Sequence, residues 1–131
     1  MTRFVVDSSA ALQLASEGIE VAAEHELLAP TLLRSQALSA MHEAVQRGDL
    51  PAKEAREQLA RVNRMKVRYL GDAVLRKVAW EMADRLGWAS TYDAEYLALT
   101  KLQGDALVTL DADLKRAAEG IVATAPIDAV R

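Results

Sequence analysis

Residues 3–7 read Arg-Phe-Val-Val-Asp and residues 106–111 read Ala-Leu-Val-Thr-Leu-Asp, so two short apolar runs each end in an aspartate. Runs that are apolar nearly throughout are typical of strands buried on both faces of a parallel sheet. Helical patterns separate them along the chain, and such alternation predicts helices on both sides of the sheet. The sequence therefore predicts an α/β fold.

The rest of the chain continues this alternation. We expect strands at 3–6, 27–29, 67–69, 106–110 and 121–123, and helices at 10–16, 31–47, 51–65, 72–86, 92–102 and 112–119. In the helix over 72–86, one face is expected to carry Val74, Val78, Met82 and Leu86. No repeat, low-complexity tract or Pro/Gly-rich linker divides the sequence, so we expect a single domain over residues 1–131.

Composition excludes several classes of protein. The 131 residues are 51% hydrophobic and 27% charged, and no stretch approaches the roughly 18 apolar residues of a membrane span. No basic leader followed by an apolar run is present, so no secretory signal is expected. Cysteine is absent, which excludes disulfides, thiolate zinc sites and a cysteine nucleophile. We expect a cytoplasmic protein without membrane contact.

Charge is unevenly distributed along the chain. The net charge is −3, yet residues 47–68 hold seven basic and three acidic residues, a net +4 that leaves −7 for the remainder. A basic stripe on an acidic protein can hold a polyanion while another region holds a cation. A solvated helix surface explains the stripe equally well.

Three aspartates are candidates for a shared site. Asp7 and Asp111 follow two of the predicted strands, and ligands of open α/β sheets bind outside the carboxyl ends of strands. Asp93 opens a helix after small and polar residues. Each could simply cap a helix, and Ser90 with Asp93 could form a variant capping box. Together, however, clustered carboxylates need a compensating cation, and Mg²⁺ prefers carboxylate oxygens.

Other chemistries find no support in the sequence. The phosphate-loop and dinucleotide fingerprints are missing, as is the G-x-S-x-G nucleophile elbow. His25 lies between two glutamates and is expected on a wet surface, and His42 is expected to have a packing or surface role. The carboxylates suit metal-assisted phosphodiester hydrolysis, in which no Ser, Cys or His nucleophile is needed.

Four motifs in this order resemble the PIN domains of bacterial VapC toxins over nearly the whole chain. They are Val5-Val6-Asp7-Ser8-Ser9, Ala29-Pro30-Thr31-Leu32-Leu33, Thr91-Tyr92-Asp93-Ala94-Glu95-Tyr96-Leu97-Ala98-Leu99 and Val108-Thr109-Leu110-Asp111-Ala112-Asp113-Leu114. The resemblance implies a three-layer α/β/α sandwich with a short parallel sheet. It also implies a Mg²⁺- or Mn²⁺-dependent endoribonuclease that cleaves RNA, is neutralised by a cognate antitoxin and forms a homodimer.

The resemblance also assigns residues to the site. Asp7, Asp93 and Asp111 match the metal-binding and catalytic aspartates of the family, and Asp113 matches an additional acid found in some members. Ser9 and Thr109 match small hydroxyl positions that support the site.

One position departs from the family pattern. A glutamate is expected in the helix after the Pro-x-Leu-Leu segment, where this chain has Gln36. Glutamine offers a carbonyl oxygen without charge, which should lower metal affinity, and its NH₂ group can hydrogen-bond a neighbouring aspartate instead. Asp113 is the best candidate to compensate. The alternative function is therefore a catalytically weakened PIN-like module that acts by binding RNA or protein.

The basic stripe gains a role from the resemblance. Helices from Pro51 to Arg68 are expected to flank the site and to guide an RNA backbone through phosphate contacts. Arg47, Arg61 and Arg64 are the expected RNA-binding residues. Aromatic residues make up only 5% of the chain, so extensive base stacking is not indicated.

Overall fold

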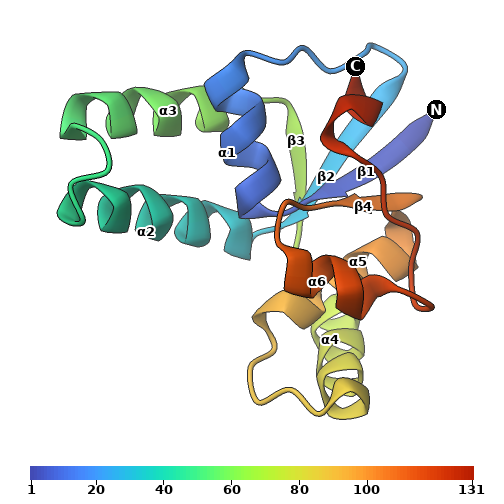
Figure 1. Ribbon diagram of the computed structural model, residues 1–131. Coiled ribbons are helices and arrows are strands. Elements are labelled where there is room, and N and C mark those ends of the chain that lie inside the picture. The colour runs from blue at the N-terminus through green and yellow to red at the C-terminus, as the bar shows by residue number, and fades with distance from the viewer.

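A computed structural model describes all residues 1–131 and contains one four-stranded parallel sheet (Figure 1). Its strands are β1 (Thr2–Val6), β2 (His25–Pro30), β3 (Val67–Leu70) and β4 (Ala106–Val108), in the spatial order β3-β2-β1-β4. Each neighbouring pair runs parallel, with Val5 opposite both Leu28 and Leu107. The predicted α/β class is confirmed.

Six α-helices connect and cover the strands. They are α1 (Ser8–Glu17), α2 (Leu32–Gln46), α3 (Ala52–Arg64), α4 (Ala73–Leu86), α5 (Tyr92–Gln103) and α6 (Ala112–Ala118), followed by the short 3₁₀ helix η1 (Ile127–Val130). Helix α5 packs across β1, β2 and β4 with α4 outside it, and α1 contacts β1, α2 and α3. Right-handed crossovers place α1 and α5 on opposite faces of the sheet, which makes three layers.

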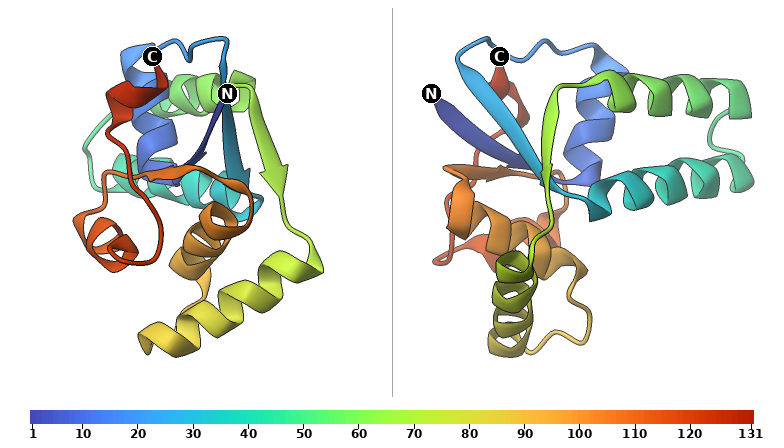
Figure 2. Two further views of the ribbon diagram at one scale, coloured as in Figure 1. Left: turned by 90° about the vertical axis from the view of Figure 1, so that its right-hand side faces the viewer. Right: turned by 180° about the vertical axis from the view of Figure 1, so that it is seen from behind.

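Helices α2 and α3 form an antiparallel hairpin that projects away from the sheet (Figures 1 and 2). Ala37, Ala44, Ala55 and Val62 are buried along its inner faces, so small side chains let the two helices approach closely. Gly48 ends the first helix with a positive φ of 79°, a conformation that glycine adopts without steric cost. The first turn of α2 begins at the sheet, and its last turn lies at the free end of the hairpin.

The core consists of the strands and the inner faces of the helices. Val5, Val6 and Leu107 are fully buried, as expected for strands covered on both sides, and α5 is buried over residues 96–100. No helix is both long and apolar enough to span a membrane.

One expectation about local structure is wrong, and another is confirmed only in part. No strand forms at 121–123; instead Ala123 and Ala125 bond to Leu107 on either side of a single parallel bridge at Thr124. In α4 Met82 is buried and Val78 and Leu86 pack against the core, as predicted, but Val74 is exposed. Leu75, Ala79 and Ala83 complete the buried face.

Strand β4 is also shorter than the expected 106–110. Thr109 and Leu110 lie outside the sheet, where the Thr109 hydroxyl donates to Asp7 just after β1 and the N–H of Leu110 donates to Ser9 in α1. The strand therefore ends where the candidate site begins.

Candidate active site

The carboxyl ends of β1 and β4 lie side by side at the point where the strand order reverses. From β1 the chain moves outward through β2 to β3, and it then returns to the other side of β1 as β4. Such a switch point leaves a crevice between neighbouring connections, and ligands of α/β proteins bind there. Asp7 follows β1 and Asp111 follows β4, so the topology brings them to this edge.

Asp7 is buried, with 6% of its surface exposed, and its carboxylate is held by three donors. Oδ1 accepts from the Ser9 hydroxyl (2.7 Å) and from the N–H of Ala10 (2.9 Å), which caps α1. Oδ2 accepts from the Thr109 hydroxyl. Asp7 therefore caps α1, and this role is compatible with the predicted role in a site.

The two hydroxyls that hold Asp7 also bind the segment after β4. Ser9 Oγ accepts from the N–H of Leu110 (3.0 Å), and Thr109 Oγ1 accepts from the N–H of Asp111 (3.0 Å). This network couples the end of β1 to the start of α6. Ser9 and Thr109, expected as supporting residues, both lie in direct contact with Asp7.

Asp111 and Asp93 complete the acidic cluster. Asp111 caps α6, since its Oδ1 accepts from the N–H groups of Asp113 (2.9 Å) and Leu114 (3.2 Å). Asp93 lies in the first turn of α5 and caps nothing. Burial, then the negative charge of Asp111, then that of Asp7 raise the pKa of Asp93 above its ordinary value. The three carboxylates therefore lie close enough to interact.

No basic side chain neutralises this cluster. All five ion pairs of the chain lie elsewhere, so Asp7, Asp93 and Asp111 have no cationic partner within 4 Å. The variant capping box between Ser90 and Asp93 does not form, because Ser90 Oγ accepts instead from the N–H of Tyr92 (3.2 Å). Uncompensated carboxylates of this kind attract a cation.

Gln36 lies at this site, as its helical phase predicts. It lines an open pocket of about 500 Å³ together with Asp93 and residues 87–90 and 92. Its Oε1 accepts from the Tyr96 hydroxyl at 2.6 Å. Burial first, and then the charges of Asp7 and Asp93, raise the pKa of that phenol, which therefore remains a donor.

The chemistry of the donors fits a hard divalent cation, since the available ligands are carboxylate and amide oxygens. As the side chains stand, however, no group of three or more acidic or histidine residues is arranged to hold an ion. A metal held jointly by Asp7, Asp93 and Asp111 therefore requires them to draw together.

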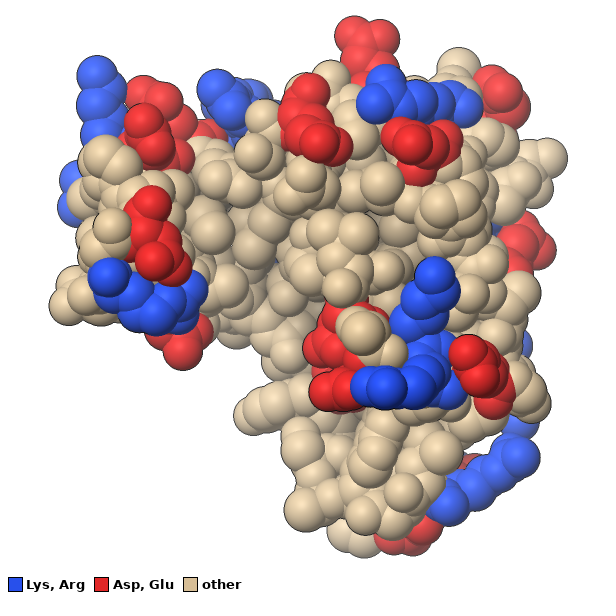
Figure 3. Space-filling model, in the orientation of Figure 1, with Lys and Arg blue, Asp and Glu red and all other residues tan.

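Asp113 does not join the cluster, and the expectation that it compensates for Gln36 is wrong. Its carboxylate pairs with Arg116 one turn further along α6, and its side chain is 89% exposed. Position i+2 after a capping residue turns away from the cap, so Asp113 faces solvent. On the face shown in Figure 3, acidic and basic side chains lie next to each other over α6.

The basic stripe does not flank the acidic cluster, so that expectation is also wrong. Arg61 and Arg64 lie in the last turn of α3, which leads into the amino end of β3. Arg47 lies at the free end of the α2–α3 hairpin and pairs with Asp49 at 3.0 Å. Their contact with RNA stays a prediction, and it concerns surfaces remote from the carboxylates.

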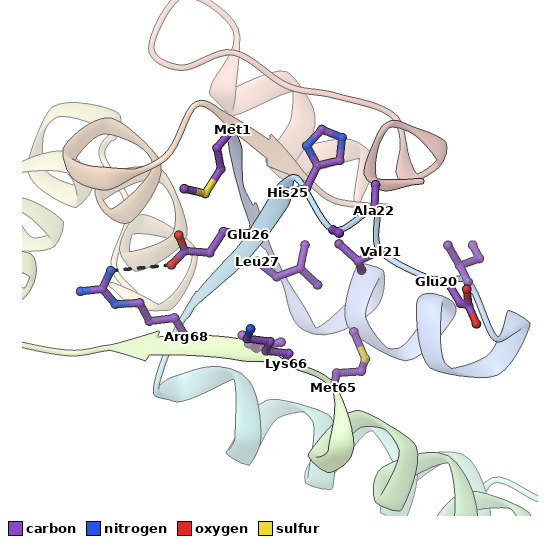
Figure 4. A pocket seen from close by; sticks show the side chains of 13 residues that line it. Met1, Glu20, Val21, Ala22, His25, Glu26, Leu27, Met65, Lys66 and Arg68 are labelled. Atoms are coloured by element: carbon purple, nitrogen blue, oxygen red, sulfur yellow. Dashed lines mark ion pairs between the residues drawn. The ribbon is translucent and has the colours of Figure 1, made fainter.

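A larger cavity of about 930 Å³ lies at the opposite, amino edge of the sheet (Figure 4). Apolar side chains such as Leu27 and Met65 line it, and Glu26 pairs there with Arg68 at 3.7 Å. His25 packs edge-on against Phe4 with a buried Nδ1 that has no partner, so it is not the wet surface residue that its neighbours predicted. None of the candidate aspartates reaches this cavity.

Sequence reasoning gave no role to Tyr96 or to the aromatic residues beside Gln36. Tyr96 lies three residues after Asp93, hence on the same face of α5, and this spacing was the available signal. Trp88 and Tyr92 belong to the α4–α5 connection and the start of α5, where no periodic pattern marks a pocket.

Comparisons with known proteins show a related fold and a family. The fold is similar to that of PAE2754 from Pyrobaculum aerophilum, with a TM-score of 0.71 and 24% identity over 98% of this chain and 85% of that chain. It is also similar to VapBC2 from Rickettsia felis bound to a DNA fragment from their promoter, with a TM-score of 0.64 and 9% identity over 95% of this chain and 98% of that one. No curated protein matches the sequence. The family model of the PIN domain matches residues 4–120, and the chain therefore belongs to the PIN domain family.

Proposed function

We propose that this chain is a divalent-metal-dependent endoribonuclease of the VapC type, the toxin of a toxin–antitoxin pair. One observation carries the proposal: Asp7, Asp93 and Asp111, from three separate segments, converge at the carboxyl edge of the sheet without a cationic partner. Membership of the PIN family supports it, because PIN domains are generally nucleases that use divalent metals.

In this proposal Asp7, Asp93 and Asp111 hold Mg²⁺ or Mn²⁺. The bound ion would make a water molecule more acidic, neutralise the scissile phosphate and stabilise the leaving oxygen. The chain's own contribution is orientation. Ser9 and Thr109 hold both oxygens of Asp7 in place, and Asp111 is fixed by the first turn of α6. Asp93 has the freedom to move because no hydrogen bond within the chain restrains its carboxylate.

The proposal extends to partners and to organisation. A cognate antitoxin and a second copy of the chain are its expected protein partners, and residues 1–131 are taken as one domain acting in the cytoplasm. The similarity to VapBC2 supports a fold of this kind, and the sequence motifs support the VapC assignment within the family.

The second candidate is a PIN-like module with weakened or lost catalysis. Gln36 favours it, because its Oε1 is already occupied by the Tyr96 hydroxyl and it brings no charge to the cluster. The second candidate is also favoured because no three acidic or histidine side chains are arranged to hold an ion. Such a protein would bind RNA or a protein partner without cleaving it.

A ribonuclease assay on total RNA separates the two candidates. The nuclease proposal predicts cleavage with Mg²⁺ or Mn²⁺, none with EDTA, and loss of most cleavage in Asp7→Asn and Asp111→Asn. Asp113→Asn is the matched control, since this acid is two residues from Asp111 but faces solvent, and it should cleave like the wild type. Cleavage in EDTA that survives Asp7→Asn would refute the nuclease proposal. No cleavage by the wild type would favour the binding module.

A further inference from the structure

The pocket beside Asp93 has a mostly uncharged lining, unlike the acidic cluster that it adjoins. Its walls come from Gln36 in α2 and from residues 87–90, 92 and 93 at the α4–α5 connection (Figure 1). Asp93 is its only charged lining residue. A volume of about 500 Å³ falls in the range of small-molecule sites.

Two aromatic rings line this pocket in a chain that has only six aromatic residues. Trp88 is half-buried and packs against the core, which fixes its ring, whereas Tyr92 is 58% exposed. The exposed ring of Tyr92 is therefore accessible to a ligand in the pocket. Flat heteroaromatic ligands stack on such rings.

Gln36 adds a directed hydrogen-bond donor. Its Oε1 accepts from the Tyr96 hydroxyl, which orients the amide and leaves Nε2 as the free end. No hydrogen bond within the chain uses this Nε2, and Gln36 lines the pocket. An acceptor on a bound ligand can therefore bond to it. A glutamate at this position would present a second acceptor instead.

We propose that this pocket binds one nucleobase of the RNA substrate, adjacent to the phosphate that is cleaved. The base stacks on Trp88 and Tyr92, and one of its carbonyl oxygens or ring nitrogens accepts from Gln36 Nε2. A neutral base suits this site better than a phosphate does, because Asp93 repels anions and no basic residue lines the pocket. The assignment of RNA as the ligand rests on the proposed function.

Fluorescence can detect the base directly, because Trp88 is one of only two tryptophans. The other, Trp80, is on α4, 67% exposed and outside the pocket. Trp80→Phe leaves Trp88 as the single reporter, and Trp88→Phe leaves Trp80 as the matched control. The probes are uridine and adenosine 5′-monophosphates and a 2′-O-methyl RNA oligonucleotide that resists cleavage, all titrated in EDTA.

We expect saturable quenching in Trp80→Phe and none in Trp88→Phe. Anisotropy of the labelled oligonucleotide should show about fivefold or greater weakening for Tyr92→Ala, because base stacking is lost. Gln36→Met, which keeps the side chain's length but not its donor, should also bind more weakly. Equal quenching of the two tryptophan variants, or unchanged affinity in Tyr92→Ala, would overturn the proposal.

The same titration distinguishes this proposal from the nuclease assignment. Asp7→Asn is expected to lose cleavage but to retain quenching, because Asp7 does not line the pocket. Quenching by a wild-type protein that cuts no RNA would overturn the nuclease assignment and leave the base pocket standing. Metal-dependent cleavage without quenching would overturn the base pocket and leave the nuclease assignment standing.

Discussion

Replacing Asp7 with alanine or with asparagine separates its role in the fold from its role in chemistry. Alanine removes the cap of α1, worth about 1 kcal/mol. It also removes the charged acceptor of the Ser9 and Thr109 hydroxyls, where such a bond contributes about 1.5–3 kcal/mol. Because the three bonds share one carboxylate and are not additive, we expect Asp7→Ala to lower the free energy of unfolding by about 3–4 kcal/mol. Asparagine caps helices equally well and keeps the Oδ1 acceptor, but its amide nitrogen cannot accept from the Thr109 hydroxyl, so Asp7→Asn should lose about 1.5–2 kcal/mol.

The assay is urea denaturation followed by circular dichroism in EDTA, so that no metal contributes. The two variants should differ by about 1.5–2 kcal/mol, while Asp7→Asn remains folded and inactive. If the free energies of unfolding of Asp7→Ala and Asp7→Asn differ by less than about 0.5 kcal/mol, which is the usual effect of a surface substitution, the hydroxyl network does not stabilise the fold. A slope m that changes between variants would instead indicate a departure from two-state unfolding.

Three further outcomes follow from the structure. Because the pKa of Asp93 is raised in the folded protein, its protonated form stabilises the fold below the ordinary pKa of 3.8, and this stabilisation is lost as the pH rises through the raised pKa. Asp93→Asn should therefore raise the Tm of the metal-free protein at pH 7. A Tm equal to that of the wild type would contradict this. Gln36→Glu should strengthen Mn²⁺ binding measured by thermal shift, since it adds a charge beside Asp93, and unchanged affinity would place position 36 outside the metal's ligands. Gly104→Ala should lower the free energy of unfolding by about 1–3 kcal/mol, because the new Cβ would lie 2.8 Å from Cγ2 of the buried Val5 behind the site, and chemical denaturation giving an unchanged midpoint would show that β1 can shift.

Much of this site follows from local patterns in the sequence. Short apolar strands that end in Asp7 and near Asp111 predict where both carboxylates lie, because parallel strands present their carboxyl ends at one edge. The helical phase of residues 31–47 was enough to predict that Gln36 faces the pocket beside Asp93. These inferences succeeded because each depends on the period of one element and on a general rule of topology.

The expectations that failed depend on contacts between elements that are distant in sequence. The arginines of residues 47–68 are close to the site along the chain, but the α2–α3 hairpin carries Arg47 to its free end and returns Arg61 to the amino edge. Asp113 faces solvent and pairs with Arg116, although it is only two residues from Asp111. The expected strand at 121–123 had the right composition, but only Thr124 bridges to β4.

Calorimetric titration of Mn²⁺ into the protein tests the central claim most directly, because it requires neither an RNA substrate nor a partner. If Asp7, Asp93 and Asp111 draw together around an ion, the wild type and Asp113→Asn will give the same saturable isotherm, and Asp93→Asn will abolish it or weaken it at least tenfold. A flat titration for the wild type, or binding that Asp93→Asn leaves unchanged, would contradict the account.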